Sequence, residues 1–248
     1  MRELTVSHCE TRPYLSLIIP AYNEETRIVS TLDRVREYLA ATFESWNIIG
    51  VDDGSTDGTL NVMRKWAAEN EGLRIVSYKP NVGKGYAVRQ GVFAADGEFI
   101  AFSDADLSAP IEELAKLFDA INKGYDIAIG SRAVKGASIP VHQPFYRELG
   151  GKGLNLIIQT LAVPGIRDTQ CGFKLFRGDV AREIFSKCFV NRWGFDVEVL
   201  YLARRLGYSI AEIGVKWGHA EGSKIKPVPA AFGIIRDLVR IRLHRYDL

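Results

Sequence analysis

Short apolar runs alternate with amphipathic helical patterns through the first half of the chain, and this alternation constrains the fold more than any other feature. The runs that indicate buried strands are 15–19, 46–51, 73–77 and 98–102. Between the first two runs, residues 28–39 repeat apolar side chains at helical spacing. Strands that alternate with helices in this way form a mostly parallel sheet with helices on both faces. We therefore predict an α/β fold in which residues 15–121 supply four strand–loop–helix units.

The second half continues the pattern less regularly. Further strands are expected at 125–130, after the loop that begins at residue 168, and at 208–217. Residues 133–145 contain Gly and Pro and indicate a loop, and helices are expected over 149–161, 199–206 and 230–245. The sequence contains neither an internal repeat nor a linker, so we predict one domain over residues 1–248.

The totals exclude several classes of protein. A net charge of +2 is too small to indicate nucleic-acid binding. Cys9, Cys171 and Cys188 are widely spaced and form no C-x-x-C motif, so neither a disulfide framework nor a zinc site is expected. Residues 1–13 lack the features of a signal peptide, and no apolar run reaches the length of about 18 residues that a transmembrane helix needs. We expect a cytoplasmic protein.

Polar side chains gather where the predicted strands end. The carboxyl ends of parallel strands meet at one edge of a sheet, and ligands of such sheets bind there. The residues that follow these strand ends and carry polar groups are Asn23, Glu24, Asp52, Asp53, Lys84, Asp104 and Asp106. Scattered surface charge has no reason to collect at successive strand ends, so we expect a binding site at this edge.

Asp104-Ala105-Asp106 is the most informative of these segments. Two carboxylates one residue apart at the exit of a buried strand repel each other, and a divalent cation removes that repulsion. Mg²⁺ and Mn²⁺ prefer oxygen ligands and keep open positions for substrate phosphates. An ordinary acidic loop is the alternative for an isolated D-x-D motif.

The loops after the second and third strands have two interpretations each. Asp52 and Asp53 can accept hydrogen bonds from a nucleobase or a ribose, or they can form an Asx-turn or a helix cap, the role that we favour for Asp57. The segment 81–85 places Lys84 in a tight turn that suits either a phosphate or solvent. It is not a Walker motif, and no G-x-G-x-x-G follows the first strand, which argues against a dinucleotide-binding oxidoreductase.

These segments together carry a family resemblance. The first half resembles the nucleotide-sugar half of a family 2 glycosyltransferase with the GT-A fold, through Ile-Pro-Ala-Tyr-Asn-Glu at 19–24, Val-Asp-Asp-Gly-Ser-Thr-Asp-Gly-Thr at 51–59, Asn-Val-Gly-Lys-Gly at 81–85 and Asp-Ala-Asp-Leu-Ser at 104–108. The second half resembles the polyprenyl-phosphate sugar synthases, especially the dolichyl-phosphate β-glucosyltransferases, with the dolichyl-phosphate mannosyltransferases as near relatives. That likeness rests on 130–132, Arg147 with 153–155, 167–176 and 192–198.

The resemblance implies an inverting transfer of a hexose from a nucleotide sugar to the phosphate of a polyprenol. It places the metal, Mg²⁺ or Mn²⁺, on Asp104 and Asp106, and the acceptor phosphate on Arg132 and Arg147. Arginine suits that phosphate because its guanidinium binds two oxygens at once. The residues expected to bind the nucleotide sugar are Pro20, Ala21, Tyr22, Glu24, Asp52, Asp53, Lys84, Asp104, Ala105 and Asp106. Residues 15–121 then form the donor and metal half, 122–228 the acceptor half, and 229–248 a basic tail.

Asp196 and Glu198 lie near the start of a predicted helix, beside Trp193 and Phe195. We treat Asp196 as a candidate catalytic residue that touches sugar hydroxyls, or that serves as general base if the acceptor is a hydroxyl. Favourable negative charge at a helix N-terminus is the other interpretation. Cys171 is expected to be a packed thiol, because no histidine partner is evident.

The sequence leaves alternatives open for the sugar donor, for the acceptor and for the cellular location. UDP-glucose is the preferred donor and GDP-mannose the second, while a soluble sugar or a protein hydroxyl is an alternative acceptor. A nucleotide-sugar-binding protein without activity is the non-enzymatic alternative, which the intact Asp pair opposes. The pattern of residues 230–245 is that of a basic amphipathic helix, which can contact the cytoplasmic face of a membrane or dock on the domain.

Overall fold

The computed structural model describes residues 12–138, 153, 155–218 and 227–248 of the chain. The strands are β1 (Leu15–Ala21), β2 (Trp46–Asp53), β3 (Leu73–Tyr78), β4 (Phe99–Ser103), β5 (Ile127–Ser131), β6 (Phe173–Arg177) and β7 (Ile210–Gly214). The helices are α1 (Ile28–Thr42), α2 (Thr59–Glu69), α3 (Lys84–Ala94), α4 (Leu114–Asn122), α6 (Gly178–Lys187), α7 (Phe195–Arg205) and α8 (Pro227–Leu243). A 3-10 turn, η1 (Ile111–Glu113), precedes α4, and residues 155–161 are also helical.

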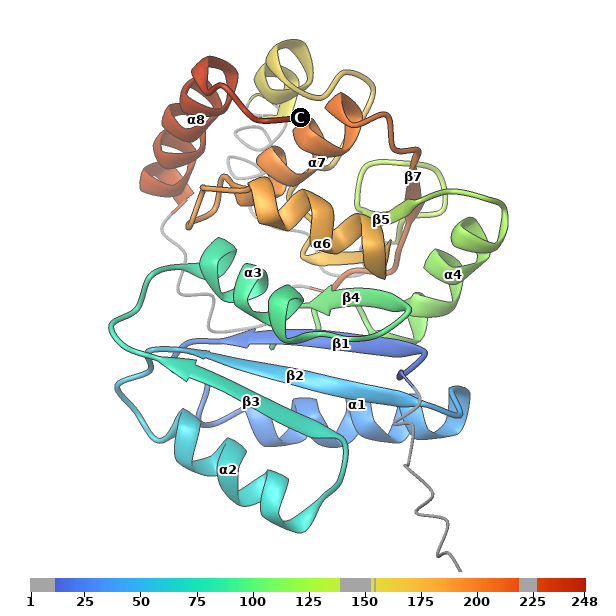
Figure 1. The fold of residues 1–248 in the computed structure, drawn as a ribbon, viewed down its shortest axis with the longest axis vertical. Coiled ribbons are helices and arrows are strands. Elements are labelled where there is room, and N and C mark those ends of the chain that lie inside the picture. The colour runs from blue at the N-terminus through green and yellow to red at the C-terminus, as the bar shows by residue number, and fades with distance from the viewer. Residues whose placement is uncertain (1–11, 139–152, 154, 219–226) are drawn as a thin grey trace, which may run out of the picture.

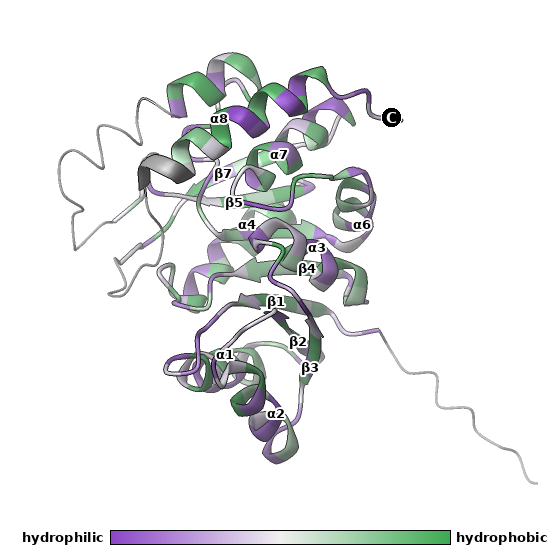
Figure 2. Cartoon of the chain, turned by 90° about the vertical axis from the view of Figure 1, so that its left-hand side faces the viewer, coloured by the Kyte–Doolittle hydropathy of each residue, from purple (hydrophilic) through white to green (hydrophobic). Residues whose placement is uncertain are grey.

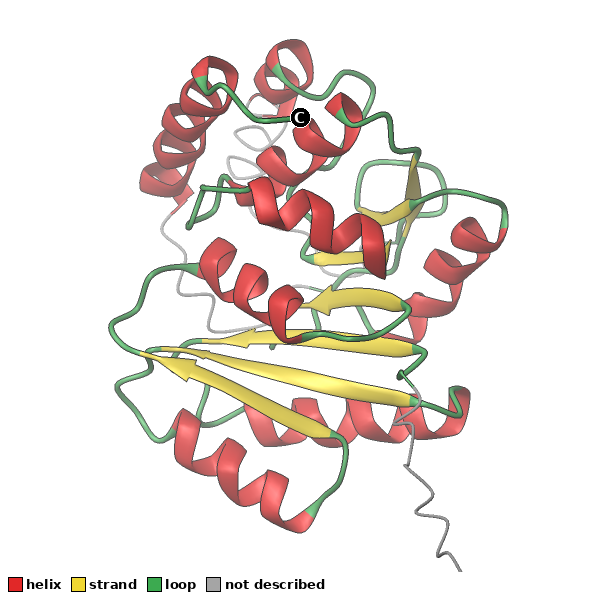
Figure 3. Ribbon diagram, in the orientation of Figure 1, coloured by secondary structure: helices red, strands yellow, loops and turns green. Residues whose placement is uncertain are grey.

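All seven strands belong to one sheet, in the order β3-β2-β1-β4-β6-β5-β7 (Figures 1 and 3). Every neighbouring pair is parallel except the two pairs that involve β6, which runs antiparallel to β4 and to β5. The mostly parallel sheet predicted from the sequence is therefore confirmed. Because β6 alone is reversed, it begins at the edge where the other strands end. The loop before β6 thus meets the loops after β4 and β5.

The side-chain alternation of the strands divides the core into two layers. In β1, Leu15, Leu17 and Ile19 pack in one cluster with residues of α1 and α4, while Ile18 faces the opposite cluster. That second cluster contains residues of α3, α6, α7 and α8. Successive strand residues point to opposite faces, so a run that is apolar throughout needs a helical layer on each side. Both faces of the sheet are therefore covered, as Figure 1 shows.

Differences from the predicted elements are concentrated in the second half. Helix α7 begins at Phe195 rather than at residue 199, so Asp196 and Glu198 lie in its first turn. That position is favourable for acidic residues because the N-terminal end of a helix carries partial positive charge. No element was assigned to residues 178–187, which form α6, and β7 is shorter than the strand predicted over 208–217.

Helix α8 confirms the helix predicted over residues 230–245. Its buried side includes Ile234, Leu238 and Ile241, which pack in the same cluster as α7. Its outer side exposes Phe232, Val239 and Leu243, and apolar and polar residues alternate along it in Figure 2. Within the described part of the chain, no helix has both the length and the apolar content needed to cross a membrane.

Candidate functional site

The reversed strand β6 places a glycine backbone directly against the first aspartate of the D-x-D motif. Ser103 pairs with Phe173 in the sheet, so Asp104 and Gly172 follow as the next neighbours. A Cβ atom built on Gly172 would lie 2.1 Å from Oδ2 of Asp104. Only glycine leaves room for this carboxylate, and the close approach fixes one side of the site.

The loop that carries the aspartates is held in a strained turn. Leu107 has a φ of 46°, a left-handed conformation that costs energy for a branched side chain and that is often found at functional sites. The turn is fixed by Leu107 N–H, which donates to Asp104 O at 3.1 Å, and by Ser108 N–H, which donates to Asp106 Oδ1 at 2.9 Å. Thr31 Oγ1 donates to Ala105 O at 2.6 Å from helix α1. The two carboxylates therefore sit on a rigid segment.

Lys84, the first residue of α3, forms an ion pair with Asp104. Its side chain is 14% exposed and that of Asp104 is 35% exposed. Burial alone would lower the pKa of Lys84, but the charges of Asp104 and Asp196 outweigh it and raise this pKa. The Nζ of Lys84 also lies 5.6 Å from the centre of the Trp193 ring. Lys84 is therefore a charged cation beside the loop that carries Asp104 and Asp106.

Asp104 and Asp106 fit the coordination habits of Mg²⁺ or Mn²⁺. Asp104 is partly exposed, Gly172 leaves space beside its Oδ2, and the cation Lys84 now balances its charge. Oδ1 of Asp106 accepts one backbone hydrogen bond, at 2.9 Å, which orients the group. Among the described residues no cluster of three or more His, Cys, Asp or Glu side chains could hold a metal. Two carboxylates leave the remaining positions of a hard cation for phosphate oxygens and water.

Asp53 holds the loop before α3. It is buried, and its carboxylate accepts hydrogen bonds from Asn81 Nδ2 at 2.7 Å, Val82 N at 2.9 Å and Gly83 N at 3.0 Å. Burial, followed by the charge of Asp53, raises the pKa of Tyr78, which lies at the end of β3. In this structure Asp53 therefore orients the segment that delivers Lys84, and its predicted contact with a nucleoside stays a prediction.

Asp52 and the loop after β1 form the neighbouring part of the predicted donor site. Asp52 is buried and accepts hydrogen bonds from Ser55 N at 3.2 Å and Ser77 Oγ at 3.0 Å, which is a turn-stabilising arrangement. Asn23 N–H donates to Ser55 Oγ at 2.9 Å, and Glu24 N–H donates to Thr59 Oγ1 at 2.7 Å. These bonds tie the two strand-end loops together.

The remaining residues of the predicted donor site differ in exposure. Tyr22 is 40% exposed, Ala21 is buried, and Glu24 forms an ion pair with Arg27 at 2.8 Å. Pro20 and Ala105 are half-buried and buried, respectively. Asp57 accepts a hydrogen bond from Thr59 N at 3.0 Å just before α2, which is an Asx-turn contact; the N-cap of α2 is Gly58 without a side-chain cap, so the capping role favoured for Asp57 is wrong. Tyr22 therefore presents the largest exposed ring of this set.

Arg132, at the end of β5, is held by Asp168 from the loop before β6. Its Nε donates to Oδ2 at 2.7 Å and one terminal nitrogen donates to Oδ1 at 2.9 Å. Burial would lower the pKa of Arg132, but Asp168 outweighs that effect and raises it, with a smaller contribution from Asp104. The guanidinium carbon also lies 5.3 Å from the centre of the Trp217 ring. Since a guanidinium has five N–H donors, this pairing leaves others available to a ligand.

The sequence analysis missed the residue that Asp196 contacts. Asp196 and Lys174 are both buried and form an ion pair, and Lys174 Nζ also donates to Cys171 O at 2.6 Å. Burial raises the pKa of Asp196, more than the charge of Lys174 lowers it. One signal could have revealed this pair: Lys174 lies between Phe173 and Leu175 in a strand covered on both faces, so its ammonium requires a buried partner.

The other predicted residues have simple placements. Glu198 is buried and accepts hydrogen bonds from Phe189 N at 3.0 Å and Val190 N at 2.8 Å. Cys171 is buried, and burial raises its pKa to about 12, so it is a packed thiol as expected. Arg147 lies outside the described residues.

Comparisons with known proteins show the family to which the chain is related. The family model described as Glycosyl transferase family 2 matches residues 16–185. A dolichyl-phosphate beta-glucosyltransferase of Dictyostelium discoideum is 37% identical over 95% of this chain and 75% of its own length. The Homo sapiens protein of the same name is 38% identical over 92% of this chain and 75% of its own length.

Solved structures support the same fold. Glucosyl-3-phosphoglycerate synthase from Mycobacterium tuberculosis, in complex with Mn²⁺, UDP and glucosyl-3-phosphoglycerate, superposes with a TM-score of 0.67. The alignment covers 92% of this chain and 80% of that chain, at 21% identity. The predicted α/β GT-A fold is thereby confirmed. The family match over most of the chain and the similarity to these relatives show that the chain belongs to glycosyltransferase family 2.

Proposed function

We propose that this protein transfers glucose from UDP-glucose to dolichyl phosphate, or to another polyprenyl phosphate, with inversion at the anomeric carbon. One observation carries the proposal: the Asp104 carboxylate forms an ion pair with Lys84 of the donor half, and its charge also helps to raise the pKa of Arg132 in the acceptor half. This arrangement suits a reaction in which one phosphate group leaves and another attacks. The names of the relatives at 37% and 38% identity support the choice of glucose and dolichyl phosphate.

In this proposal the donor half binds the leaving group. Asp104 and Asp106 hold Mg²⁺ or Mn²⁺, which when bound stabilises the negative charge of the departing nucleoside diphosphate. Lys84 exchanges its ion pair with Asp104 for a diphosphate oxygen and contributes a second positive charge. Tyr22, Glu24, Asp52 and Asp53 shape the nucleoside side of the site, directly or by holding its loops.

The acceptor half orients the attacking phosphate. Asp168 fixes the guanidinium of Arg132 through two hydrogen bonds, and the remaining N–H groups bind the acceptor phosphate, with Arg147 as the predicted second cation. A phosphate oxygen attacks the anomeric carbon while the bond from that carbon to the diphosphate oxygen breaks. Because a phosphate monoester is ionised near neutral pH, this attack needs no general base. Asp196, buried against Lys174, then acts by positioning Lys174 rather than by accepting a proton.

We also propose that the protein works as a peripheral protein on the cytoplasmic face of a membrane. The exposed Phe232, Val239 and Leu243 of α8, together with the arginines on the same helix, support contact with a lipid surface. Such contact would bring the active site to an acceptor whose hydrocarbon chain stays in the bilayer.

The test is a panel of labelled nucleotide sugars offered with polyprenyl phosphate in detergent or vesicles, with Mg²⁺, with Mn²⁺ and with a chelator. We expect a glucosyl-phosphate lipid from UDP-glucose in the presence of metal and no product with the chelator. If GDP-mannose were the only nucleotide sugar to yield a lipid product, the donor would be GDP-mannose rather than UDP-glucose. Product formation that is unaffected by the chelator would overturn the metal assignment.

A further inference from the structure

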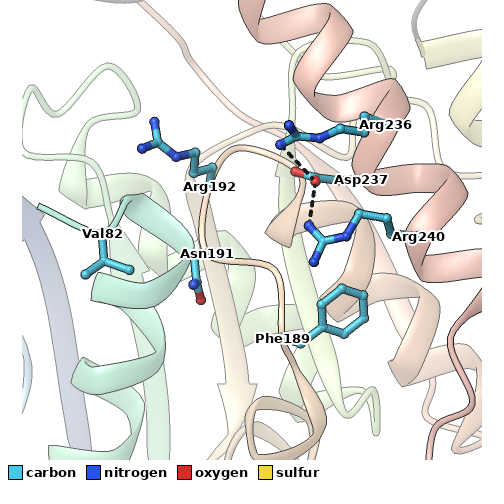
Figure 4. A pocket seen from close by; sticks show the side chains of 7 residues that line it. All are labelled: Val82, Phe189, Asn191, Arg192, Arg236, Asp237 and Arg240. Atoms are coloured by element: carbon cyan, nitrogen blue, oxygen red, sulfur yellow. Dashed lines mark hydrogen bonds and ion pairs between the residues drawn. The ribbon is translucent and has the colours of Figure 1, made fainter.

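A basic pocket lies between α8 and the loop that connects α6 to α7, and it includes neither the aspartate pair nor Arg132. Its volume is about 180 Å³, and its lining consists of Val82, Phe189, Asn191, Arg192, Arg236, Asp237 and Arg240. Figure 4 shows the two arginines of α8 and Asp237 on one side of the pocket, with Val82 and Asn191 on the opposite side. Three of the lining residues are arginines and one is an aspartate, so the pocket carries an excess of positive charge.

The loop between α6 and α7, on the side of the pocket opposite α8, is held in place by hydrogen bonds within the protein. Arg89 of α3 donates to Cys188 O and to Asn191 Oδ1, the latter at 3.0 Å. Tyr86 N–H donates to Asn191 O at 3.0 Å, and Glu198 accepts from the backbone of Phe189 and Val190. The loop is therefore fixed from α3 on one side and from α7 on the other.

The α8 side of the pocket is fixed through Asp237 (Figure 4). This carboxylate is buried, and a Cβ atom on Gly194 would lie only 2.6 Å from the Asp237 Cβ, so α8 and the loop are in close contact here. Asp237 receives Arg240 at 3.2 Å and Arg236 at 3.6 Å. One carboxylate between two guanidinium groups holds them side by side while leaving most of their N–H donors unused.

The arginines of the pocket are accessible, and the carboxylate of Asp237 neutralises only part of their positive charge. The side chains of Arg236 and Arg240 are 68% and 53% exposed. Within the described residues, the side chain of Arg192 has no ion pair or hydrogen bond, although it lines the same pocket. Three arginines line this pocket, and the two on α8 share a single carboxylate, so the pocket has the chemistry of a site for a doubly charged anion.

We propose that this pocket binds a phosphate group, which comes either from a lipid headgroup or from a soluble phosphate ester. Helical spacing places Arg236 and Arg240 along one flank of the exposed stripe Phe232, Val239 and Leu243. A phosphate bound by Arg236 and Arg240 would therefore lie beside the exposed apolar side chains of α8. The pocket lining includes none of the residues proposed to bind the metal, the diphosphate or the acceptor phosphate, so binding there can be measured without donor or acceptor.

The test compares two charge-matched variants of the full chain without donor or acceptor. Arg236→Gln/Arg240→Gln removes pocket charge, while Arg242→Gln/Arg245→Gln removes the same charge from the same end of the chain outside the pocket lining. Binding is measured to phosphatidylcholine vesicles with and without phosphatidic acid, and separately to glycerol 3-phosphate by calorimetry. Arg192→Gln changes the pocket from the loop side and leaves both arginine partners of Asp237 in place, so it separates lost binding from altered folding.

We expect the pocket pair and Arg192→Gln to weaken binding to phosphatidic acid vesicles about tenfold, which corresponds to about 1.4 kcal/mol. The control pair should lose clearly less. A loss seen only with glycerol 3-phosphate would also support the phosphate site and would identify a soluble ester as its source. Equal losses in the two pairs would point to general attraction to an anionic surface and would overturn the proposal. So would unchanged binding of both probes by the pocket variants.

Discussion

At the scale of single residues, three ion pairs hold the charged side chains in and around the aspartate loop. Lys84 pairs with Asp104, Lys174 with Asp196, and Arg132 with Asp168. The charges interact beyond these contacts, since both Asp104 and Asp196 raise the pKa of Lys84. The sequence identified most of the acids and Arg132 but not Lys174, because a lysine in an apolar strand indicates that it has a buried partner but not which residue that partner is.

Replacement of Lys174 should be strongly destabilising. Lys174→Met leaves the Asp196 carboxylate buried without its partner, which typically costs about 3–5 kcal/mol. The double variant Lys174→Met/Asp196→Leu removes both charges and should recover most of the stability. Urea unfolding measures both free energies. If the double variant is no more stable than Lys174→Met, the unpaired Asp196 carboxylate is not the cause of the lost stability.

Acid should weaken the pair between Arg132 and Asp168. Burial would raise the pKa of Asp168, but Arg132 outweighs it and lowers this pKa below the ordinary value of 3.8. A carboxyl whose pKa is depressed by folding stabilises the protein above the unfolded-state pKa and loses that effect as pH falls through the folded-state value. Asp168→Asn should therefore lower stability at neutral pH, by about 2 kcal/mol, and flatten the acid limb of the stability curve below about pH 4. An unchanged acid limb would contradict this assignment.

The two described cysteines should resist alkylation in the folded protein. Cys171 and Cys188 are buried, and burial raises the pKa of each thiol, to about 12 for Cys171. Iodoacetamide at neutral pH should leave both unmodified in native protein and modify both in denaturant, as peptide mass spectrometry would report. Rapid native labelling of Cys171 would reopen its exclusion as a nucleophile.

At the scale of elements, the reversed strand β6 is the feature that completes the site. The alternating pattern of the first half predicted β1 to β4 and their carboxyl-end loops, because strand and helix periods are local properties of the sequence. It could not predict that β6 would lie antiparallel between β4 and β5, since strand order depends on long-range packing. The close contact between Gly172 and Asp104 follows from that strand order and could not be predicted from the D-x-D motif.

Gly172→Ala should damage the site while sparing the fold. The added methyl group would lie 2.1 Å from Asp104 Oδ2 and would displace that carboxylate. A displacement on this scale can lower kcat/KM about a hundredfold. Gly233→Ala is the matched control, because a Cβ there meets nothing within 4 Å. Steady-state kinetics and the metal dependence of UDP binding provide the readout, and wild-type values for Gly172→Ala would contradict the proposed crowding.

At the scale of the whole molecule, one sheet joins the predicted donor and acceptor halves, and α8 closes the side of the sheet that carries α3, α6 and α7. The sequence predicted the donor half more completely than the acceptor half. Strand-end motifs lie within single loops, whereas acceptor residues such as Arg132 and Asp168 come together only through tertiary structure. Arg147, the second acceptor arginine inferred from the resemblance, stays a prediction.

The outer face of α8 should hold the molecule at a lipid surface. Phe232→Ser/Leu243→Ser keeps the buried residues Ile234, Leu238 and Ile241 and removes two exposed apolar side chains. Each lost apolar group typically reduces burial energy by about 1.5–3 kcal/mol when fully inserted, so vesicle co-sedimentation should fall at least tenfold. Undiminished co-sedimentation of the folded variant would exclude this face as the contact.

The central claim is that the attacking group is a phosphate held by Arg132. In the direct measurement, the wild-type protein is incubated with UDP-glucose, metal and either a polyprenyl phosphate or the polyprenol that lacks the phosphate. The same reactions are repeated with Arg132→Gln. Our account predicts a lipid-linked glucose product from the phosphate alone, with Arg132→Gln raising the KM for polyprenyl phosphate far more than that for UDP-glucose. Equal transfer to the free polyprenol, or a defect of Arg132→Gln confined to UDP-glucose, would contradict it.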